Sequence, residues 1–145
     1  MTDPIAELAD LLGRDFMLRA GNGGGGDAAA ETPLSNEGVR RAAQWIVDEL
    51  TRLGVERATI HETSAHPIVT AEWMHAGDDA PTVLVYCHYD VQPADPLDEW
   101  IRPPFDPRHE GEKVYARGAG DDKGQLFMHL KAVEAWMSTA GRLPL

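Results

Sequence analysis

An apolar run ends in a histidine and an aspartate in Val83-Leu-Val-Tyr-Cys-His-Tyr-Asp-Val-Gln-Pro93. Farther along, Arg117-Gly-Ala-Gly-Asp-Asp-Lys-Gly124 breaks into a glycine loop with two adjacent aspartates, just before a predicted helix. In α/β proteins, ligands bind at the carboxyl ends of the sheet strands. Imidazole and carboxylate groups are also common metal ligands. Together the two segments predict an α/β fold that carries half of a two-metal site.

His88 and Asp90 are the first candidate pair. Residues two apart on a strand point to the same side, so both side chains should project together from the end of the 82–87 strand. A neutral imidazole can bind a metal through one nitrogen while a carboxylate accepts the other N–H. The spacing thus predicts His88 as a ligand and Asp90 as its orienting partner. Taken alone, it more often marks a surface His–Asp pair in a turn, and that alternative stays open at this point.

Asp121 and Asp122 form the second candidate pair. A glycine-rich loop before a helix usually binds phosphate through its backbone N–H groups. Two carboxylates would repel phosphate, so a cation fits this loop better. One aspartate is also expected to cap the helix N-terminus, but capping needs only one.

Hydrophobic spacing predicts the remaining elements. Thr82–Cys87 is a continuous apolar run and should be a central strand that is covered on both faces. Residues 13–35 hold a glycine run and are expected to be a flexible segment. The order of the elements predicts a mixed α/β sheet layered with helices. Helices are expected at 4–18, 37–53 and 124–139, strands at 58–62, 67–74, 82–87 and 112–116, and an ordered loop at 91–111.

Composition narrows the functional classes. The 145 residues make one domain or part of one, with a net charge of −11. Such a charge argues against nucleic acid as a partner, because no basic stripe exists to neutralise phosphates. The single Cys87 excludes an intramolecular disulfide. The sequence shows neither a signal peptide nor an apolar run of membrane-spanning length, so no membrane association is predicted and the cytoplasm is the expected compartment.

Three motifs occur in order, and together they resemble the M20 family of zinc metallopeptidases, in particular its carnosinase-like dipeptidases. The resemblance covers residues 36–140 and is most specific over 83–127. The motifs are His88-Tyr-Asp-Val-Gln-Pro93, Trp100 with Pro103-Pro-Phe105, and Tyr115-Ala-Arg-Gly-Ala-Gly-Asp-Asp-Lys-Gly-Gln125.

The resemblance implies the three-layer helix/mixed sheet/helix fold of zinc exopeptidases, with residues 1–145 as an N-terminal part of the catalytic domain. His88 would bind one metal, Asp121 would bridge two, Asp90 would orient His88, and the Asp121–Asp122 peptide would be cis. The implied cofactor is a pair of zinc ions, with manganese or cobalt as alternatives. The implied reaction is hydrolysis of dipeptides, short peptides or N-acyl amino acids by a metal-activated water. Complete family members are often homodimers.

The sequence also departs from the family. It holds no Glu-Glu pair, which in the family supplies the general base and a metal ligand, and segment 13–35 does not match the family's usual start. The family's lid or dimerisation domain is not among the 145 residues either. Two hypotheses therefore stand: the chain is part of a dinuclear zinc dipeptidase, or it is a catalytically silent fragment or subunit that another chain completes. Arg117 has two interpretations as well, as an anchor for a substrate carboxylate or as a structural salt bridge beneath the aspartate loop.

Overall fold

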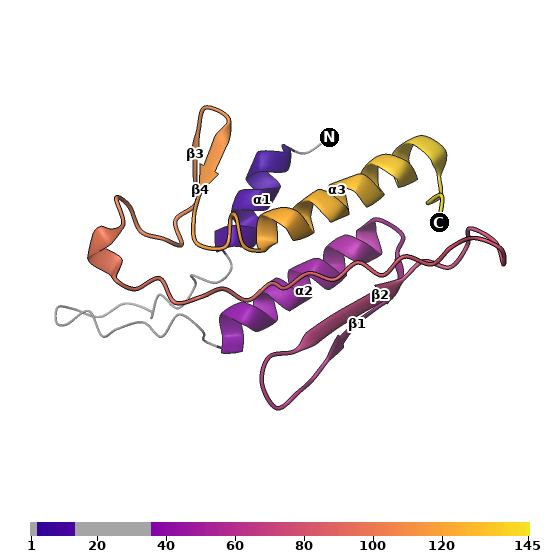
Figure 1. The fold of residues 1–145 in the computed structure, drawn as a ribbon, viewed down its shortest axis with the longest axis horizontal. Helices are drawn as coiled ribbons and strands as arrows, with labels where there is room; N and C mark the ends of the chain where they lie inside the picture. The colour runs from indigo at the N-terminus through magenta and orange to yellow at the C-terminus, as the bar shows by residue number, and fades with distance from the viewer. Residues whose placement is uncertain (1–2, 14–35) are drawn as a thin grey trace.

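The computed structural model describes residues 3–13 and 36–145 (Figure 1). Three α-helices occur among these residues: α1 (Pro4–Gly13), α2 (Asn36–Arg52) and α3 (Lys123–Ala140). The predicted helices at 37–53 and 124–139 are confirmed to within one residue at each end. The predicted helix at 4–18 is confirmed as far as Gly13. The rest of that helix, and segment 14–35 with its glycine run, lie outside the described residues.

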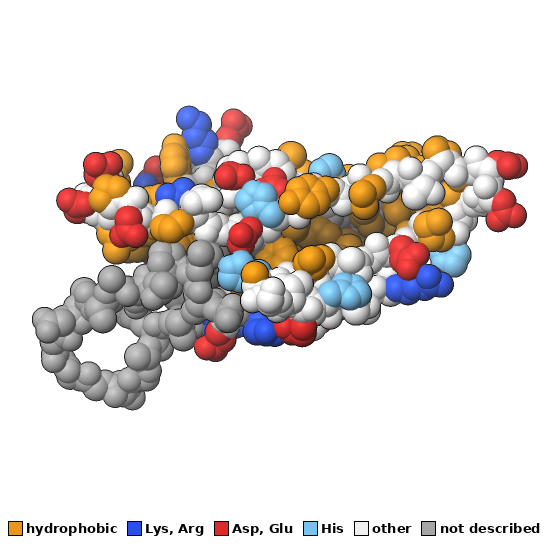
Figure 2. Space-filling view, turned by 60° about the horizontal axis from the view of Figure 1, so that its bottom comes forward, with side chains coloured by type: hydrophobic (Ala, Val, Ile, Leu, Met, Phe, Trp, Pro, Cys, Tyr) orange, Lys and Arg blue, Asp and Glu red, His pale blue; other side chains and the backbone are white. Residues whose placement is uncertain are grey.

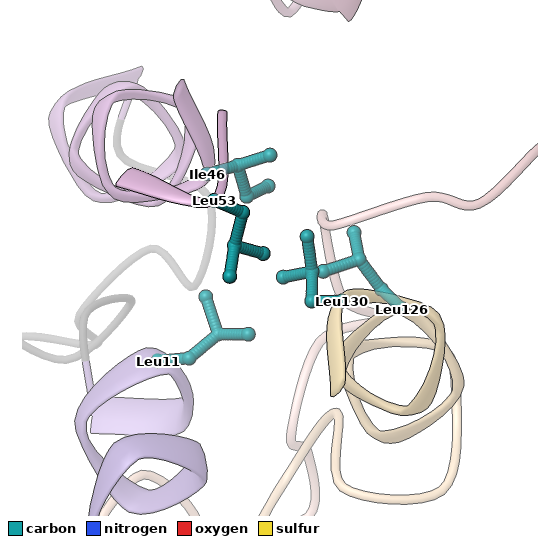
Figure 3. Packing of buried hydrophobic residues seen from close by; sticks show 5 residues of the cluster. All are labelled: Leu11, Ile46, Leu53, Leu126 and Leu130. Atoms are coloured by element: carbon teal, nitrogen blue, oxygen red, sulfur yellow. The ribbon is translucent and has the colours of Figure 1, made fainter. Parts of the chain in front are cut away.

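The hydrophobic core sits between the three helices (Figure 3). Leucine and isoleucine side chains converge there from α1, from α2 and the residue that follows it, and from α3, all less than 10% exposed. Burying such side chains stabilises the fold by roughly 1.5–3 kcal/mol each. The cluster residues of α2 and α3 belong to the apolar periodicity on which the predictions of those two helices rested. The five residues are Leu11, Ile46, Leu53, Leu126 and Leu130.

The end of α2 follows from one glycine. Gly54 has a φ of 79°, in the left-handed region that a residue with a Cβ rarely adopts. In that conformation the N–H of Gly54 bonds the carbonyl of Thr51 and the N–H of Val55 bonds that of Leu50, both at 3.0 Å. These bonds satisfy carbonyls that the helix end would otherwise leave open. The chain then turns into the first hairpin.

Two separate antiparallel hairpins replace the predicted mixed sheet. Strands β1 (Glu56–His61) and β2 (Ile68–Glu72) pair with His61 opposite Ile68, and this hairpin lies against α2 (Figure 1). Strands β3 (Arg108–Glu110) and β4 (Lys113–Tyr115) form the second hairpin. A short 3-10 helix, η2 (Leu97–Glu99), lies in the loop between them. The strand predictions at 58–62, 67–74 and 112–116 are therefore confirmed as strands, while β3 falls in what was predicted to be loop.

The prediction of a central strand at 82–87 is wrong for the described residues. This segment pairs with no strand among them, and the side chains of residues 82–86 are open to solvent: Leu84 is 90% exposed and Tyr86 85%. An apolar segment becomes a covered strand only where neighbouring strands and helices pack on it. Figure 2 shows a band of hydrophobic side chains exposed across the middle of one face. Among the described residues, no helix is both long and apolar enough to cross a membrane.

Candidate metal centre

Side chains alternate along the segment that carries His88. Cys87 and Tyr89 pack against the hydrophobic core, so the intervening His88 projects to the other side. The Tyr89 hydroxyl also donates to the carbonyl of Pro67. Burial, and next the carboxylate of Asp122, raise the pKa of the Cys87 thiol. A thiol with a raised pKa is a poor nucleophile, which agrees with a packing role for Cys87.

Both ring nitrogens of His88 face carboxylates. Nδ1 lies 3.0 Å from Oδ1 of Asp90, and Nε2 lies 3.0 Å from Oδ1 of Asp121. Nδ1 is also 3.3 Å from the backbone carbonyl of Asp90. The structure thus brings together the three residues predicted from the sequence, two from the segment after Tyr86 and one from the glycine loop.

The pKa of His88 reflects this arrangement. Burial by itself lowers the pKa of the imidazole, but the hydrogen bonds to Asp121 and Asp90 raise it, and the net change is upward. Carboxylates on both sides therefore favour a positive charge at the ring. The same two carboxylates would also stabilise a metal cation bound at Nε2.

The glycine loop holds Asp121 and Asp122 through close backbone packing. The Asp121–Asp122 peptide bond is cis, as the family resemblance implied. The N–H of Lys123 bonds the carbonyl of Gly118 at 3.1 Å, and the amide of Gln125 donates to the carbonyl of Gly120 at 2.7 Å. The loop is thereby closed onto the first turn of α3.

The prediction of an aspartate side-chain cap on α3 is wrong. Asp122 occupies the N-cap position, but its side chain makes no capping hydrogen bond. Its Oδ2 instead accepts the backbone N–H of His88 at 3.0 Å. The bond to a distant segment takes the carboxylate away from its own helix, and it fixes the backbone of His88 against the loop of Asp121.

The donor atoms suit a zinc ion. Zinc binds histidine nitrogen and carboxylate oxygen at about 2.0–2.2 Å, so two ligands of one tetrahedral ion lie roughly 3–3.5 Å apart. His88 Nε2 and Asp121 Oδ1 are 3.0 Å apart, which is compatible with that spacing. Asp90 on the opposite nitrogen is the partner that a zinc-bound histidine usually has. The residues present therefore fit two ligand positions of a zinc site.

A second cluster of carboxylates was missed from the sequence. Glu7, Glu49 and Glu134 bring carboxylate oxygens from α1, α2 and α3 within 4.8 Å of one another. Lys131 bonds both Glu7 and Glu134, and Arg52 bonds Glu49 at 2.6 Å and Glu134 at 2.7 Å. Because two cations already neutralise these carboxylates, the cluster is an ion-pair network between helices. No local motif marks it, since its members come from three distant parts of the chain.

The other histidines stand apart from the centre. His61 bonds the hydroxyl of Thr70 across the first hairpin, and His75 pairs with Glu56. His129 is exposed on α3. Among residues 3–13 and 36–145, none of these three histidines joins a group of three side chains that could hold a metal ion.

Comparison with known proteins agrees with this geometry. The model of peptidase family M20/M25/M40 matches residues 84–144. The chain is 35% identical over 100 residues to the cysteinylglycine-S-conjugate dipeptidase of Corynebacterium striatum, covering 69% of this chain and 22% of that protein. It is 37% identical over 120 residues to the Cys-Gly metallodipeptidase DUG1 of Candida albicans, covering 74% and 25%. With the succinyl-diaminopimelate desuccinylase of Nitrosospira multiformis the identity is 33% over 109 residues, covering 74% and 26%.

Comparison of the fold with solved structures also finds an M20 family enzyme. The structure of the M20 family metallo-carboxypeptidase Sso-CP2 from Sulfolobus solfataricus superposes with a TM-score of 0.74 and 32% sequence identity, over 97% of this chain and 28% of that one. The likeness indicates the α/β fold, although the described residues form only short hairpins. The chain spans about a quarter of the length of these relatives. By its motifs, its relatives and its fold, the chain belongs to peptidase family M20/M25/M40.

Proposed function

We propose that these residues form part of a dinuclear zinc centre that hydrolyses amide bonds in dipeptides, short peptides or N-acyl amino acids. His88 and Asp121 would hold the metal, Asp121 would be shared with the second ion, and Asp90 would orient the His88 ring. The observation that carries the proposal is the position of the His88 ring, between Asp90 and Asp121 with 3.0 Å to each. Asp90 on Nδ1 matches the carboxylate partner of a zinc-bound histidine, and Nε2 with the oxygen of Asp121 supplies nitrogen and oxygen donors that zinc binds.

Each residue has a separate task in this proposal. Asp90 accepts a hydrogen bond from Nδ1–H, which keeps the proton on Nδ1 and leaves the lone pair of Nε2 free for the metal. Asp122 accepts the backbone N–H of His88 and so keeps the imidazole beside Asp121. When bound, zinc supplies Lewis-acid polarisation of the scissile carbonyl and lowers the pKa of water.

The substrate class follows from the relatives. Two are named for the hydrolysis of cysteinylglycine compounds, and one for the removal of a succinyl group from diaminopimelate. All three reactions cleave an amide next to an amino acid. A short peptide with a free carboxylate, such as Cys-Gly, is therefore the first substrate to test.

A second candidate function is metal binding without turnover. His88 and Asp121 supply two ligand atoms, whereas a catalytic zinc usually takes three from the protein. The 145 residues also lack a Glu-Glu pair, which the resemblance assigns to the general base. On this alternative the chain binds zinc but hydrolyses peptides only when another polypeptide segment completes the site.

Zinc titration by calorimetry, followed by a Cys-Gly hydrolysis assay, tests both candidates. His88→Ala and Asp121→Ala should each weaken zinc binding at least tenfold. His129→Ala, which removes an exposed histidine on α3, is the matched control and should bind as the parent chain does. Unchanged zinc affinity in His88→Ala would refute the site. Binding without turnover would favour the second candidate, and turnover that His88→Ala abolishes would favour the first.

A further inference from the structure

Arg117 connects the glycine loop to the segment that follows His88 and Asp90. Its backbone N–H donates to the carbonyl of Pro104 at 2.6 Å. Its guanidinium Nη2 donates to the carbonyl of Pro93 at 3.2 Å. Pro93 follows Asp90 closely in the chain, and Arg117 directly precedes the loop that carries Asp121. One residue therefore joins the two segments that supply the proposed metal ligands.

Trp100 strengthens this connection. The guanidinium carbon of Arg117 lies 5.1 Å from the centre of the Trp100 ring, within the range of a cation–π contact. The indole N–H of Trp100 donates to the carbonyl of Ala94 at 2.8 Å, and Ala94 is 0% exposed. The guanidinium is thus held between the face of Trp100 and the carbonyl of Pro93, while Trp100 itself is fixed to the residue after Pro93.

The contacts of Arg117 differ from a structural salt bridge. Among residues 3–13 and 36–145, Arg117 forms no ion pair with a carboxylate. Its Nε is shielded from solvent and has no hydrogen-bond partner within the same ranges. The side chain binds a backbone carbonyl and an aromatic ring, two groups without net charge. Its effect on the centre is therefore exerted through the positions of chain segments.

We propose that Arg117 is a positioning residue, which sets the separation of His88 and Asp121 and with it the affinity and geometry of metal binding. This inference rests on the metal site proposed above. A metal site needs its ligands within about 0.5 Å of the productive arrangement. His88 and Asp121 come from different segments, which are also joined by the contact between their side chains and by the bond from the His88 N–H to the Asp122 carboxylate. Loss of the Arg117 guanidinium removes the hydrogen bond that holds the segment of His88 and Asp90 at Pro93.

Titration with Co²⁺ tests the proposal, because the visible spectrum of bound cobalt reports coordination geometry as well as affinity. Arg117→Met keeps an unbranched side chain at this position but removes the guanidinium and its contact with Trp100. It should bind Co²⁺ about tenfold more weakly, with an altered visible spectrum, as changes in the partners of metal ligands commonly do. Arg117→Lys keeps a charge over Trp100 and one donor for Pro93, and should show a smaller change of the same kind.

Arg102→Met is the matched control. Arg102 lines the same groove of about 560 Å³ as Trp100 and Arg117. It has no hydrogen bond or ion pair within the described residues. Cobalt affinity and spectrum should therefore match those of the parent chain. If Arg117→Met does not fold, Arg117→Lys against Arg102→Met is the deciding comparison.

A measurement without metal separates this inference from the proposed function. In the metal-free chain, the NMR resonances of the His88 ring should shift in Arg117→Met and stay in place in Arg102→Met. If cobalt binding is absent or insensitive to His88→Ala, the proposed metal site fails, whatever the resonances of His88 do. If His88→Ala abolishes binding but Arg117→Met keeps the parent affinity, spectrum and His88 resonances, the positioning role is overturned. A lower melting temperature with an unchanged cobalt spectrum would overturn it too.

Discussion

Gly124→Ala should destabilise the chain at the point where the glycine loop meets α3. A Cβ on Gly124 would lie 2.2 Å from the carbonyl oxygen of Ala119, well inside the 3.0 Å below which real Cβ contacts are not found. The obstacle is backbone, so no side chain can rotate away. The loop that carries Asp121 must instead shift by about 1 Å, because a clash with backbone is relieved by a movement of the backbone.

The magnitude follows from two opposing terms. Overpacking of this kind costs about 1–3 kcal/mol. Alanine in a helix recovers at most about 1 kcal/mol relative to glycine. We expect the free energy of unfolding to fall by about 1–2 kcal/mol. With a denaturant slope of about 2 kcal/mol per molar urea, the midpoint of unfolding should drop by roughly 0.5–1 M.

Urea denaturation followed by circular dichroism measures this change. Gly120→Ala is the matched control, because a Cβ at Gly120 in the same loop would meet nothing within 4 Å. It should stay within about 0.5 kcal/mol of the parent chain. If Gly124→Ala is as stable as Gly120→Ala, the tight contact between Gly124 and Ala119 does not exist in the molecule, and the account of how the loop holds Asp121 is wrong.

Three further predictions concern stability, each measured by urea denaturation. Leu130→Ala should cost about 2–5 kcal/mol, because Leu130 is 6% exposed within the core cluster. Leu84→Lys should change the free energy of unfolding by less than about 0.5 kcal/mol, since Leu84 is 90% exposed; a larger loss would mean that another segment covers it. Hydrogen bonds from Lys131 and Arg52 lower the pKa of Glu134 below its ordinary 4.5. The contribution of Glu134 to the free energy of unfolding should therefore be complete above pH 4.5 and be lost as the pH falls through the lower pKa of the folded state. Lys131→Met should diminish this loss.

The helices could be predicted because their information is local. Val39, Ala43 and Ile46 recur at helical spacing, and all three are buried. Gly54 marks the end of α2 for a reason that is visible in the sequence, since glycine readily adopts a positive φ. Strand β3 could not be found in the same way. Arg108-His-Glu110 contains no apolar residue, and it is a strand only because Gly111, at a φ of 60°, turns the chain back onto β4.

The segment 82–87 shows the limit of the hydrophobic pattern. An apolar run indicates that a segment is suited to a covered strand, but strand formation depends on a neighbour that donates and accepts hydrogen bonds. Within the described residues no such neighbour pairs with it, and its large side chains are exposed. Even so, alternation survives at its end, where Cys87 and Tyr89 face the core and His88 faces Asp121.

The glycine loop at Arg117–Gly124 shows which contacts of the site could be predicted from a sequence motif and which could not. That His88, Asp90 and Asp121 meet could be predicted, because strand alternation and motif order are read directly from the sequence. The bond from Asp122 to the N–H of His88 could not, since capping of α3 is the local preference of an aspartate and the bond joins residues 34 positions apart. What allows that bond is the loop backbone: Gly118 at a φ of 83°, and Gly124 with no Cβ to push Ala119 away. The glycines of Arg117–Gly124 therefore bear on the site as directly as its carboxylates, and substitutions at Gly124 should impair metal binding by moving Asp121 without removing a ligand.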